Sequence, residues 1–129
     1  MSKEERFNDV ETVSVKDKPR FSETVSGETT RFACSIDDKE VGSISATLVG
    51  ENTYNVGGLF VDPAERGQGI SSQLVKLVNS FLKENKALGQ LVNTVKGEVA
   101  VVYERNGWTR GDYKSHGAYG AYEYHYDGR

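Results

Sequence analysis

A segment with the residues needed to bind phosphate lies in the middle of the chain, from Val61 to Ser71 (VDPAERGQGIS). Pro63 stops the strand before it, because proline offers no amide to a strand ladder, and helical spacing of apolar residues starts directly after Gly69. Free amides at a helix N-terminus bind anions, and glycine lets an anion come close to the backbone. The segment therefore predicts a pyrophosphate site on the amides of residues 66–71.

Two familiar phosphate-binding loops do not fit this segment. It contains no Lys followed by Ser or Thr, as a P-loop requires, and Ser72 stands where a dinucleotide-binding fingerprint has its last glycine. A Gly-x-Gly pair before a helix also occurs in plain strand-to-helix turns. The pair alone therefore does not establish a ligand site.

The elements before this loop are predicted to be strands. Val10 to Val15 alternates apolar and polar residues and predicts a first strand, and residues 16–29 are expected to form an irregular connection. From Thr30 onward, RFACSI, a polar DDKE turn and EVGSISATLVG predict a β-hairpin.

A further strand is predicted from Tyr54 to Val61, directly before the loop. Its paired glycines, Gly57 and Gly58, indicate a bulge or the close approach of a ligand.

After the loop, apolar residues at helical spacing predict an amphipathic helix that ends near Gly89. A short strand is expected over residues 91–95 and a second helix from Glu98 to Asn106, followed by two strands that begin near Trp108. The predicted fold is an α/β (α+β) mixed sheet of about six or seven strands with two main helices packed on it.

Length and composition favour one compact domain over residues 1–129, since 36% of the residues are hydrophobic. The 19 acidic and 16 basic residues disfavour nucleic acid as a partner.

No apolar stretch reaches the roughly 18 residues of a membrane span, and residues 1–10 lack a signal-peptide pattern, so a cytoplasmic protein is expected. Cys34, the single cysteine, is expected in the core, and His116 and His125 lack the neighbours of a metal site.

A second motif, Tyr103-Glu-Arg-Asn-Gly107-Trp108, lies at the end of the second predicted helix. Together the two segments resemble the GNAT superfamily of N-acetyltransferases. In that family an Arg or Gln is followed three residues later by Gly and two after that by Gly or Ala; Arg66 and Gly69 match, and Ser71 departs. The second motif is similar to the family's Tyr-x-x-x-Gly-Phe. The resemblance covers residues 30–126 in element order.

The resemblance implies direct transfer of an acetyl group from acetyl-CoA to a primary amine, on a small molecule or a protein. Tyr103 matches the family's proton donor to the leaving thiolate, although packing of its helix is the competing interpretation. The strand before the loop would present its backbone to the pantetheine arm. The cofactor-binding residues implied in this way are Leu59, Phe60, Val61, Arg66, Gly67, Gln68, Gly69, Ile70 and Ser71. Asn93, on the next strand, is expected either to bind cofactor or to pair in the sheet.

A general base is not evident, because the strand before the loop carries no carboxylate. Asn55 is expected to order a water that relays the proton. Three glutamates are candidates for the remote acceptor, and solvent is the alternative: Glu51, Glu98 and Glu123.

The chain departs from the family before Thr30, because residues 16–29 are too short for the family's usual one or two helices. The acceptor site is therefore expected to be open. The same departure motivates an alternative, a catalytically inactive GNAT-like module that binds coenzyme A or another protein. The tyrosines and His116 of the two last strands suit a wall that touches ligand, a homodimer partner or an ordinary sheet edge: Tyr113, Tyr119, Tyr122, Tyr124 and Tyr126.

Overall fold

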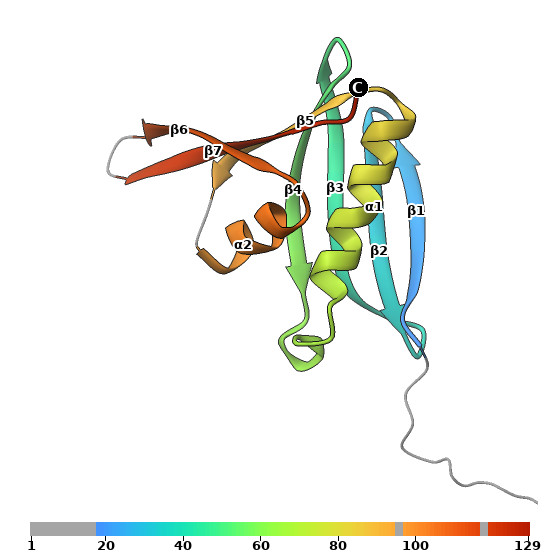
Figure 1. Cartoon of the computed structure of the whole chain (residues 1–129). Helices are drawn as coiled ribbons and strands as arrows, with labels where there is room; N and C mark the ends of the chain where they lie inside the picture. Colours follow the sequence, from blue (N-terminus) through green and yellow to red (C-terminus); the bar gives the residue numbers. More distant parts are fainter. Residues whose placement is uncertain (1–17, 95–96, 117–118) are drawn as a thin grey trace, which may run out of the picture.

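The computed structural model describes residues 18–94, 97–116 and 119–129, with side chains described for residues 18–91, 99–111 and 123–129. Seven strands and two α-helices follow one another along this part of the chain (Figure 1). Their bounds are β1 Arg20–Ser26, β2 Thr29–Ile36, β3 Lys39–Gly50, β4 Thr53–Val61, α1 Ile70–Glu84, β5 Leu88–Thr94, α2 Gly97–Arg105, β6 Thr109–His116 and β7 Tyr119–Asp127, with a short 3-10 helix over Pro63–Glu65.

All seven strands belong to one mixed sheet with the order β1-β2-β3-β4-β5-β7-β6. Strands β1 to β4 form an antiparallel meander, β4 pairs with β5 in parallel, and β7 pairs antiparallel with β5 and β6. Asp37 and Asp38 both have positive φ and close the β2–β3 hairpin with a two-residue turn, which suits the twist of paired strands. The predicted mixed sheet with two helices is confirmed.

The prediction of an irregular connection over residues 16–29 was wrong, because β1 occupies residues 20–26. Every residue of β1 is exposed, since this edge strand pairs only with β2 in the described sheet. An edge strand without a buried face lacks the alternation of apolar and polar residues from which a strand is predicted. The first strand predicted at Val10 to Val15 lies outside the described residues.

The predicted helix end at Gly89 was also wrong. Helix α1 ends at Glu84, and Lys86, with a φ of 51°, turns the chain into β5. Gly89 lies within β5, where an added Cβ would come within 2.6 Å of Leu82 and 2.8 Å of Trp108. This glycine permits close packing and does not terminate a helix.

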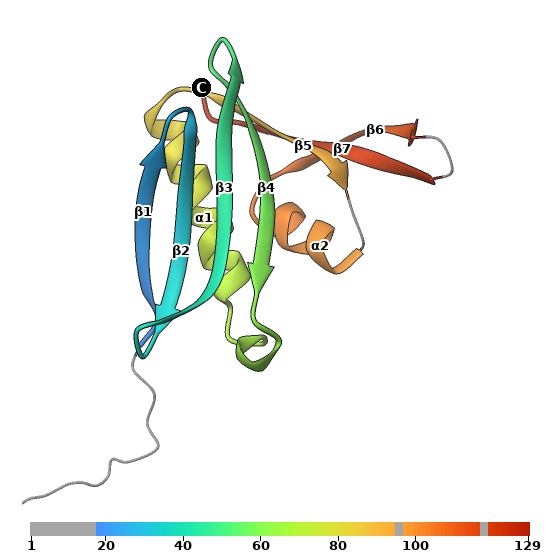
Figure 2. The same ribbon diagram turned by 180° about the vertical axis from the view of Figure 1, so that it is seen from behind.

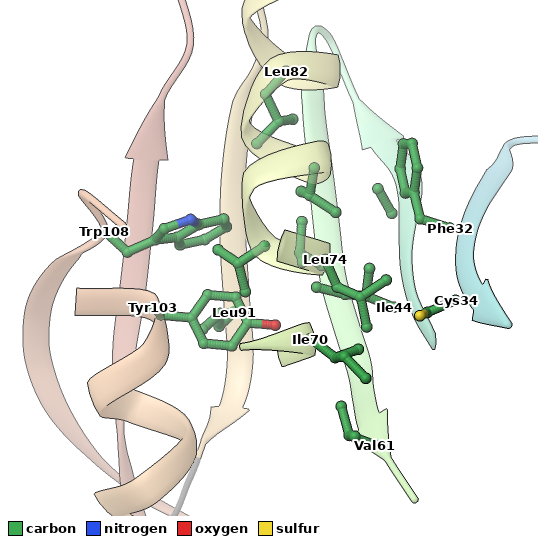
Figure 3. Close-up of a cluster of buried hydrophobic side chains, with 14 of the residues drawn as sticks. Phe32, Cys34, Ile44, Val61, Ile70, Leu74, Leu82, Leu91, Tyr103 and Trp108 are labelled. Atoms are coloured by element: carbon green, nitrogen blue, oxygen red, sulfur yellow. The ribbon is translucent and has the colours of Figure 1, made fainter. Parts of the chain in front are cut away.

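The hydrophobic core lies between α1 and the sheet. The buried face of α1 carries Leu74, Val75, Val78 and Leu82, each fully buried against β2, β3 and β4. Figure 3 shows this cluster continuing to Tyr103 and Trp108, which come from α2 and the turn after it. Burial of each such aliphatic side chain contributes roughly 1.5–3 kcal/mol. The core therefore fixes α1 and, through the two aromatic side chains, α2.

The opposite face of the meander is polar. Tyr54 and Val56 point to the α1 side of β4, so Asn55 between them points to the other side. Figure 2 shows this second face from behind, with no helix of the described chain in front of β1 to β4. No helix in the described ranges is long and apolar enough to cross a lipid bilayer.

Candidate functional site

Strands β4 and β5 separate partway along their length. Their parallel pairing runs from Thr53 opposite Leu88 to Asn55 opposite Gln90 and stops there. Residues 56–61 of β4 continue without a β5 partner, and Figure 1 shows the two strands diverging on either side of α2. The backbone edge of β4 is therefore available to a ligand beyond Asn55.

A bulge in β4 coincides with this separation. The register with β3 shifts between Ser45 opposite Gly57 and Ser43 opposite Phe60, and Gly58 has a φ of 67°. The bulge predicted from the paired glycines is confirmed. A bulge bends its strand and redirects the following side chains, here those of Leu59 to Val61.

The loop after β4 leads into an uncapped helix N-terminus. Gly69 is the N-cap of α1 with a φ of 78°, a left-handed conformation that favours glycine, and no side chain caps the helix. An added Cβ at Gly67 or Gly69 would have nothing within 4 Å. The backbone of both glycines is therefore open on its Cβ side, and the first turn of α1 has no side-chain cap, as an anion site requires.

Hydrogen bonds within the protein hold two side chains of this loop, those of Arg66 and Gln68. The Arg66 Nε–H donates to the Val61 carbonyl at 3.0 Å, which leaves the terminal amino groups of the guanidinium directed elsewhere. Gln68 Nε2 donates to Glu65 Oε1 at 2.8 Å, and Glu65 is buried. The Gln68 side chain is therefore turned toward Glu65, which leaves the backbone amide of Gln68 for a ligand.

One cleft of about 260 Å³ joins these features. It runs from the bulged end of β4 to the first turn of α1 and is closed on the other side by α2. Five of its lining residues were predicted as cofactor-binding and two were not: Leu59, Phe60, Val61, Arg66 and Ser71, with Val99 and Val102 added by α2. Gly67 and Gly69 lie in the loop between the lining residues Arg66 and Ser71. The Ile70 side chain is buried in the core, so only its backbone amide could meet a ligand.

Tyr103 lies in the core and not among the residues that line the cleft. It is 1% exposed, and its ring packs edge-on against Trp108 with centroids 5.1 Å apart. In Figure 3 its hydroxyl points away from α2 toward the part of the core that holds Leu74 and Ile70. Burial raises the pKa of this hydroxyl, so it is protonated at neutral pH.

Asn55 forms a side-chain pair at the point where β4 and β5 part. Its Oδ1 accepts a hydrogen bond from Gln90 Nε2 at 2.6 Å, and both side chains are half-buried. The Asn55 amide nitrogen is not a donor in this bond and can hold a water or an acceptor group. Gln90 was not predicted as a site residue. It is 35 positions from Asn55 in the chain, and the two meet only through the register of β4 with β5.

The candidate bases are scattered. Glu51 lies in the exposed β3–β4 turn, at the far end of β4 from the cleft. Glu123 Oε1 lies 3.8 Å from His125 Nε2 on β7. His125 lies opposite Gln90, on the strand next to β5.

The side chains of Asn93 and Glu98 lie outside the described residues, as do those of Tyr113, His116, Tyr119 and Tyr122. Among described residues, no group of three His, Cys, Asp or Glu side chains is placed to hold a metal ion.

A polar network between the two helices was also missed. Ser72, Asn79 and Asn106 hydrogen-bond across the α1–α2 junction, together with Trp108. The signal in the sequence was Asn79, a polar residue directly after Val78 on the apolar face of a helix. A buried amide needs hydrogen-bond partners, which the sequence does not identify.

Known proteins share this fold and its sequence pattern. Residues 28–110 match the family described as the acetyltransferase (GNAT) domain. Similar solved structures include the ribosomal-protein-S18-alanine N-acetyltransferase from Escherichia coli, with a TM-score of 0.70 and 14% identity over 80% of this chain and 71% of that one. Nourseothricin acetyltransferase has a TM-score of 0.67 and 19% identity over 89% and 87%. The PaiA N-acetyltransferase from Thermoplasma acidophilum, in complex with coenzyme A, has a TM-score of 0.63 and 14% identity over 78% and 61%.

No curated protein sequence matches the chain significantly. The family match nevertheless spans more than half of the chain and includes the bulged strand, the loop, both helices and the cleft between them. The chain belongs to the GNAT acetyltransferase family.

Proposed function

We propose that this chain transfers the acetyl group of acetyl-CoA to a primary amine. The observation that carries the proposal is the cleft, which joins the unpaired edge of β4 to the uncapped N-terminus of α1. A cofactor with an extended amide-bearing arm and a pyrophosphate matches both ends of such a cleft.

The pyrophosphate is assigned to the amides of residues 66–71. Glycine at positions 67 and 69 leaves open space above the backbone, and the positive end of the α1 dipole favours an anion there. Arg66 lines the cleft and adds a positive charge, with its guanidinium fixed by the bond to Val61. These groups together offset the roughly two negative charges of the ligand.

The pantetheine arm is assigned to the free edge of β4 at Leu59 to Val61. An extended ligand that carries amide groups can pair with an unpaired strand edge as another strand would. Val99 and Val102 then cover the arm from the α2 side. This arrangement directs the thioester toward the point where Asn55 and Gln90 hold β4 and β5 together.

The reaction consists of attack by the neutral amine nitrogen on the thioester carbonyl carbon, followed by cleavage of the carbon–sulfur bond. A backbone amide near the β4 bulge polarises the carbonyl oxygen. The attacking nitrogen gives up its proton through water held near Asn55 or to solvent, and the departing sulfur takes one proton. We assign that proton to Tyr103. Burial raises the pKa of the Tyr103 hydroxyl and makes it a weaker acid, and the hydroxyl does not line the cleft, so the assignment rests on the match of Tyr103 to the family's proton donor.

The amine is proposed to arrive over the polar face of the sheet, which no helix of the described chain covers. An open approach can admit a small molecule or an amine on a protein surface. Each class appears in a relative's name, a ribosomal protein for one and nourseothricin for another.

One experiment tests the cofactor assignment and the chemistry in turn. Calorimetry with coenzyme A should show binding to the wild-type protein, and acetyl-CoA with a panel of amines should give free thiol. Absence of coenzyme A binding would refute the proposal.

A second candidate, coenzyme A binding without turnover, is favoured by one observation. Tyr103 is 1% exposed and packed against Trp108, as a purely structural residue would be. Binding of coenzyme A with no thiol released from acetyl-CoA by any amine in the panel would select this candidate.

A further inference from the structure

Four polar residues connect the two helices that border the cleft. Asn106, just after α2, donates from Nδ2 to Ser72 Oγ in the first turn of α1 at 3.1 Å and to the Val102 carbonyl at 2.8 Å. Asn79 Nδ2 donates to the Asn106 carbonyl at 2.8 Å, and Asn79 Oδ1 accepts from Trp108 Nε1 at 2.8 Å. Two of the four, Asn79 and Trp108, are buried.

The network touches both walls of the cleft. Ser72 follows Ser71, which lines the cleft from α1, and Val102, whose carbonyl accepts the Asn106 bond, lines it from α2. A shift of Asn106 relative to Ser72 would therefore change the distance between the walls. Both bonds are made by the half-buried side-chain amide of Asn106, and lengthening either one would leave a partly buried polar group without its partner.

The same residues close the turn that carries Tyr103. The Tyr103 carbonyl accepts the amide of Asn106 at 3.0 Å and the amide of Trp108 at 3.1 Å. The orientation of the Tyr103 ring therefore depends on where this turn is held. A paired polar network specifies the relative rotation of two helices more sharply than apolar packing alone does.

We propose that Ser72 and Asn106 are positioning residues that set α2, and with it Val102 and Tyr103, against the cofactor-binding end of α1. The proposal rests on the acetyl-transfer function proposed above. It assigns these side chains no contact with substrate, and it predicts an effect on turnover that exceeds the effect on cofactor binding.

The test uses Ser72→Ala, Ser72→Thr and Asn106→Ala, with Thr29→Val as the matched control. Thr29 Oγ1 forms a 2.9 Å side-chain hydrogen bond with Thr47 Oγ1. This bond joins β2 to β3, whereas α2 connects β5 to β6 at the other end of the sheet. All variants are assayed well below their melting temperatures for kcat and for coenzyme A affinity. Trp108 is the only tryptophan of the chain, so its fluorescence and its quenching by acrylamide report on the junction directly.

We expect kcat to fall at least about tenfold in Asn106→Ala and severalfold in Ser72→Ala, because small misplacements of reacting groups cost large factors in rate. Coenzyme A affinity should fall by a smaller factor than kcat, since the pyrophosphate amides are untouched and only the α2 wall over the pantetheine arm shifts. Trp108 should become more accessible to acrylamide in both variants. Ser72→Thr keeps the hydroxyl and should behave as wild type, and Thr29→Val should lose stability without loss of kcat.

Unchanged acrylamide quenching of Trp108 in Ser72→Ala and Asn106→Ala would overturn the proposal, whatever the wild-type activity. So would kcat values equal to wild type in variants that only melt earlier. If Asn106→Ala fails to fold, the Ser72→Ala and Ser72→Thr pair decides the question. If the wild-type protein neither binds coenzyme A nor turns over, the proposed function fails, and Trp108 quenching still reports whether the network positions α2.

Discussion

Replacement of Gly69 by alanine separates the cost of the loop conformation from its role in binding. Gly69 has a φ of 78°, and an alanine in this left-handed region costs roughly 1–2 kcal/mol. An added Cβ meets nothing within 4 Å, so no steric cost is added in the free protein. Thermal denaturation should therefore show a loss of about 1–2 kcal/mol in the free energy of unfolding, roughly 3–5 °C in Tm for each kcal/mol.

The same methyl group should weaken coenzyme A binding much further. It projects into the open space where the pyrophosphate is proposed to rest on the backbone. Loss of one hydrogen bond to a charged group costs about 1.5–3 kcal/mol, which is about a 10- to 150-fold increase in Kd. Isothermal titration calorimetry with coenzyme A measures this change directly.

Three other substitutions calibrate the result. Gly50→Ala adds a methyl group in equally open space where φ is not positive, so it should leave Kd unchanged and stabilise the protein slightly, by about 0.4–1 kcal/mol, because alanine restricts the unfolded chain. Gln68→Ala removes only the 2.8 Å side-chain bond to Glu65, so coenzyme A should still bind. Gly69→Pro removes an amide and demands a φ near −65°, so binding should be lost. A Gly69→Ala protein that melts earlier but binds coenzyme A as wild type does would refute close contact between this loop and the pyrophosphate.

Three further predictions concern other parts of the molecule. Tyr103→Phe keeps the packed ring and removes the proton donor, so kcat should fall by about 10- to 10⁴-fold with coenzyme A affinity nearly unchanged; equal activity would assign Tyr103 to the core alone. Gly89→Ala places a methyl group 2.6 Å and 2.8 Å from two packed side chains, so chemical denaturation should show a loss of about 1–3 kcal/mol, and an unchanged midpoint would contradict the packing described. Glu51→Gln, Glu98→Gln and Glu123→Gln should each keep more than about a tenth of the activity, a barrier change below ~1.4 kcal/mol, and a pH profile that loses its rising limb in any one of them would identify a dedicated base.

The loop and the bulge were predictable because their signals are local. Glycine spacing before a helix and paired glycines in a strand each restrict the backbone within a few residues, and Gly58 and Gly69 both adopt positive φ. The cleft-lining residues of β4, Leu59 to Val61, were expected from the family resemblance. Sequence reasoning therefore found five of the seven lining residues.

The missed features depend on partners far apart in the chain. Strand β1 carries no apolar alternation, because all of its residues are exposed at the sheet edge. Gly89 was predicted to end a helix, whereas it lies in a strand where Leu82 and Trp108 pack too closely for a Cβ. Val99 and Val102 have the spacing of ordinary core residues, and only the divergence of β4 from β5 turns them toward a cleft.

The sheet order has a consequence for how the protein folds as it is synthesised. Strand β7 follows every other described element in the chain, yet it lies between β5 and β6. Strands β1 to β4 pair with sequence neighbours and can form early on the emerging chain, since local contacts form quickly. Strand β5 pairs with β4 only from Leu88 to Gln90 and otherwise depends on β7. A nascent chain would therefore complete the sheet only once translation has passed Asp127 and this strand has inserted, and a ligand that binds only the completed fold would favour the inserted state by mass action.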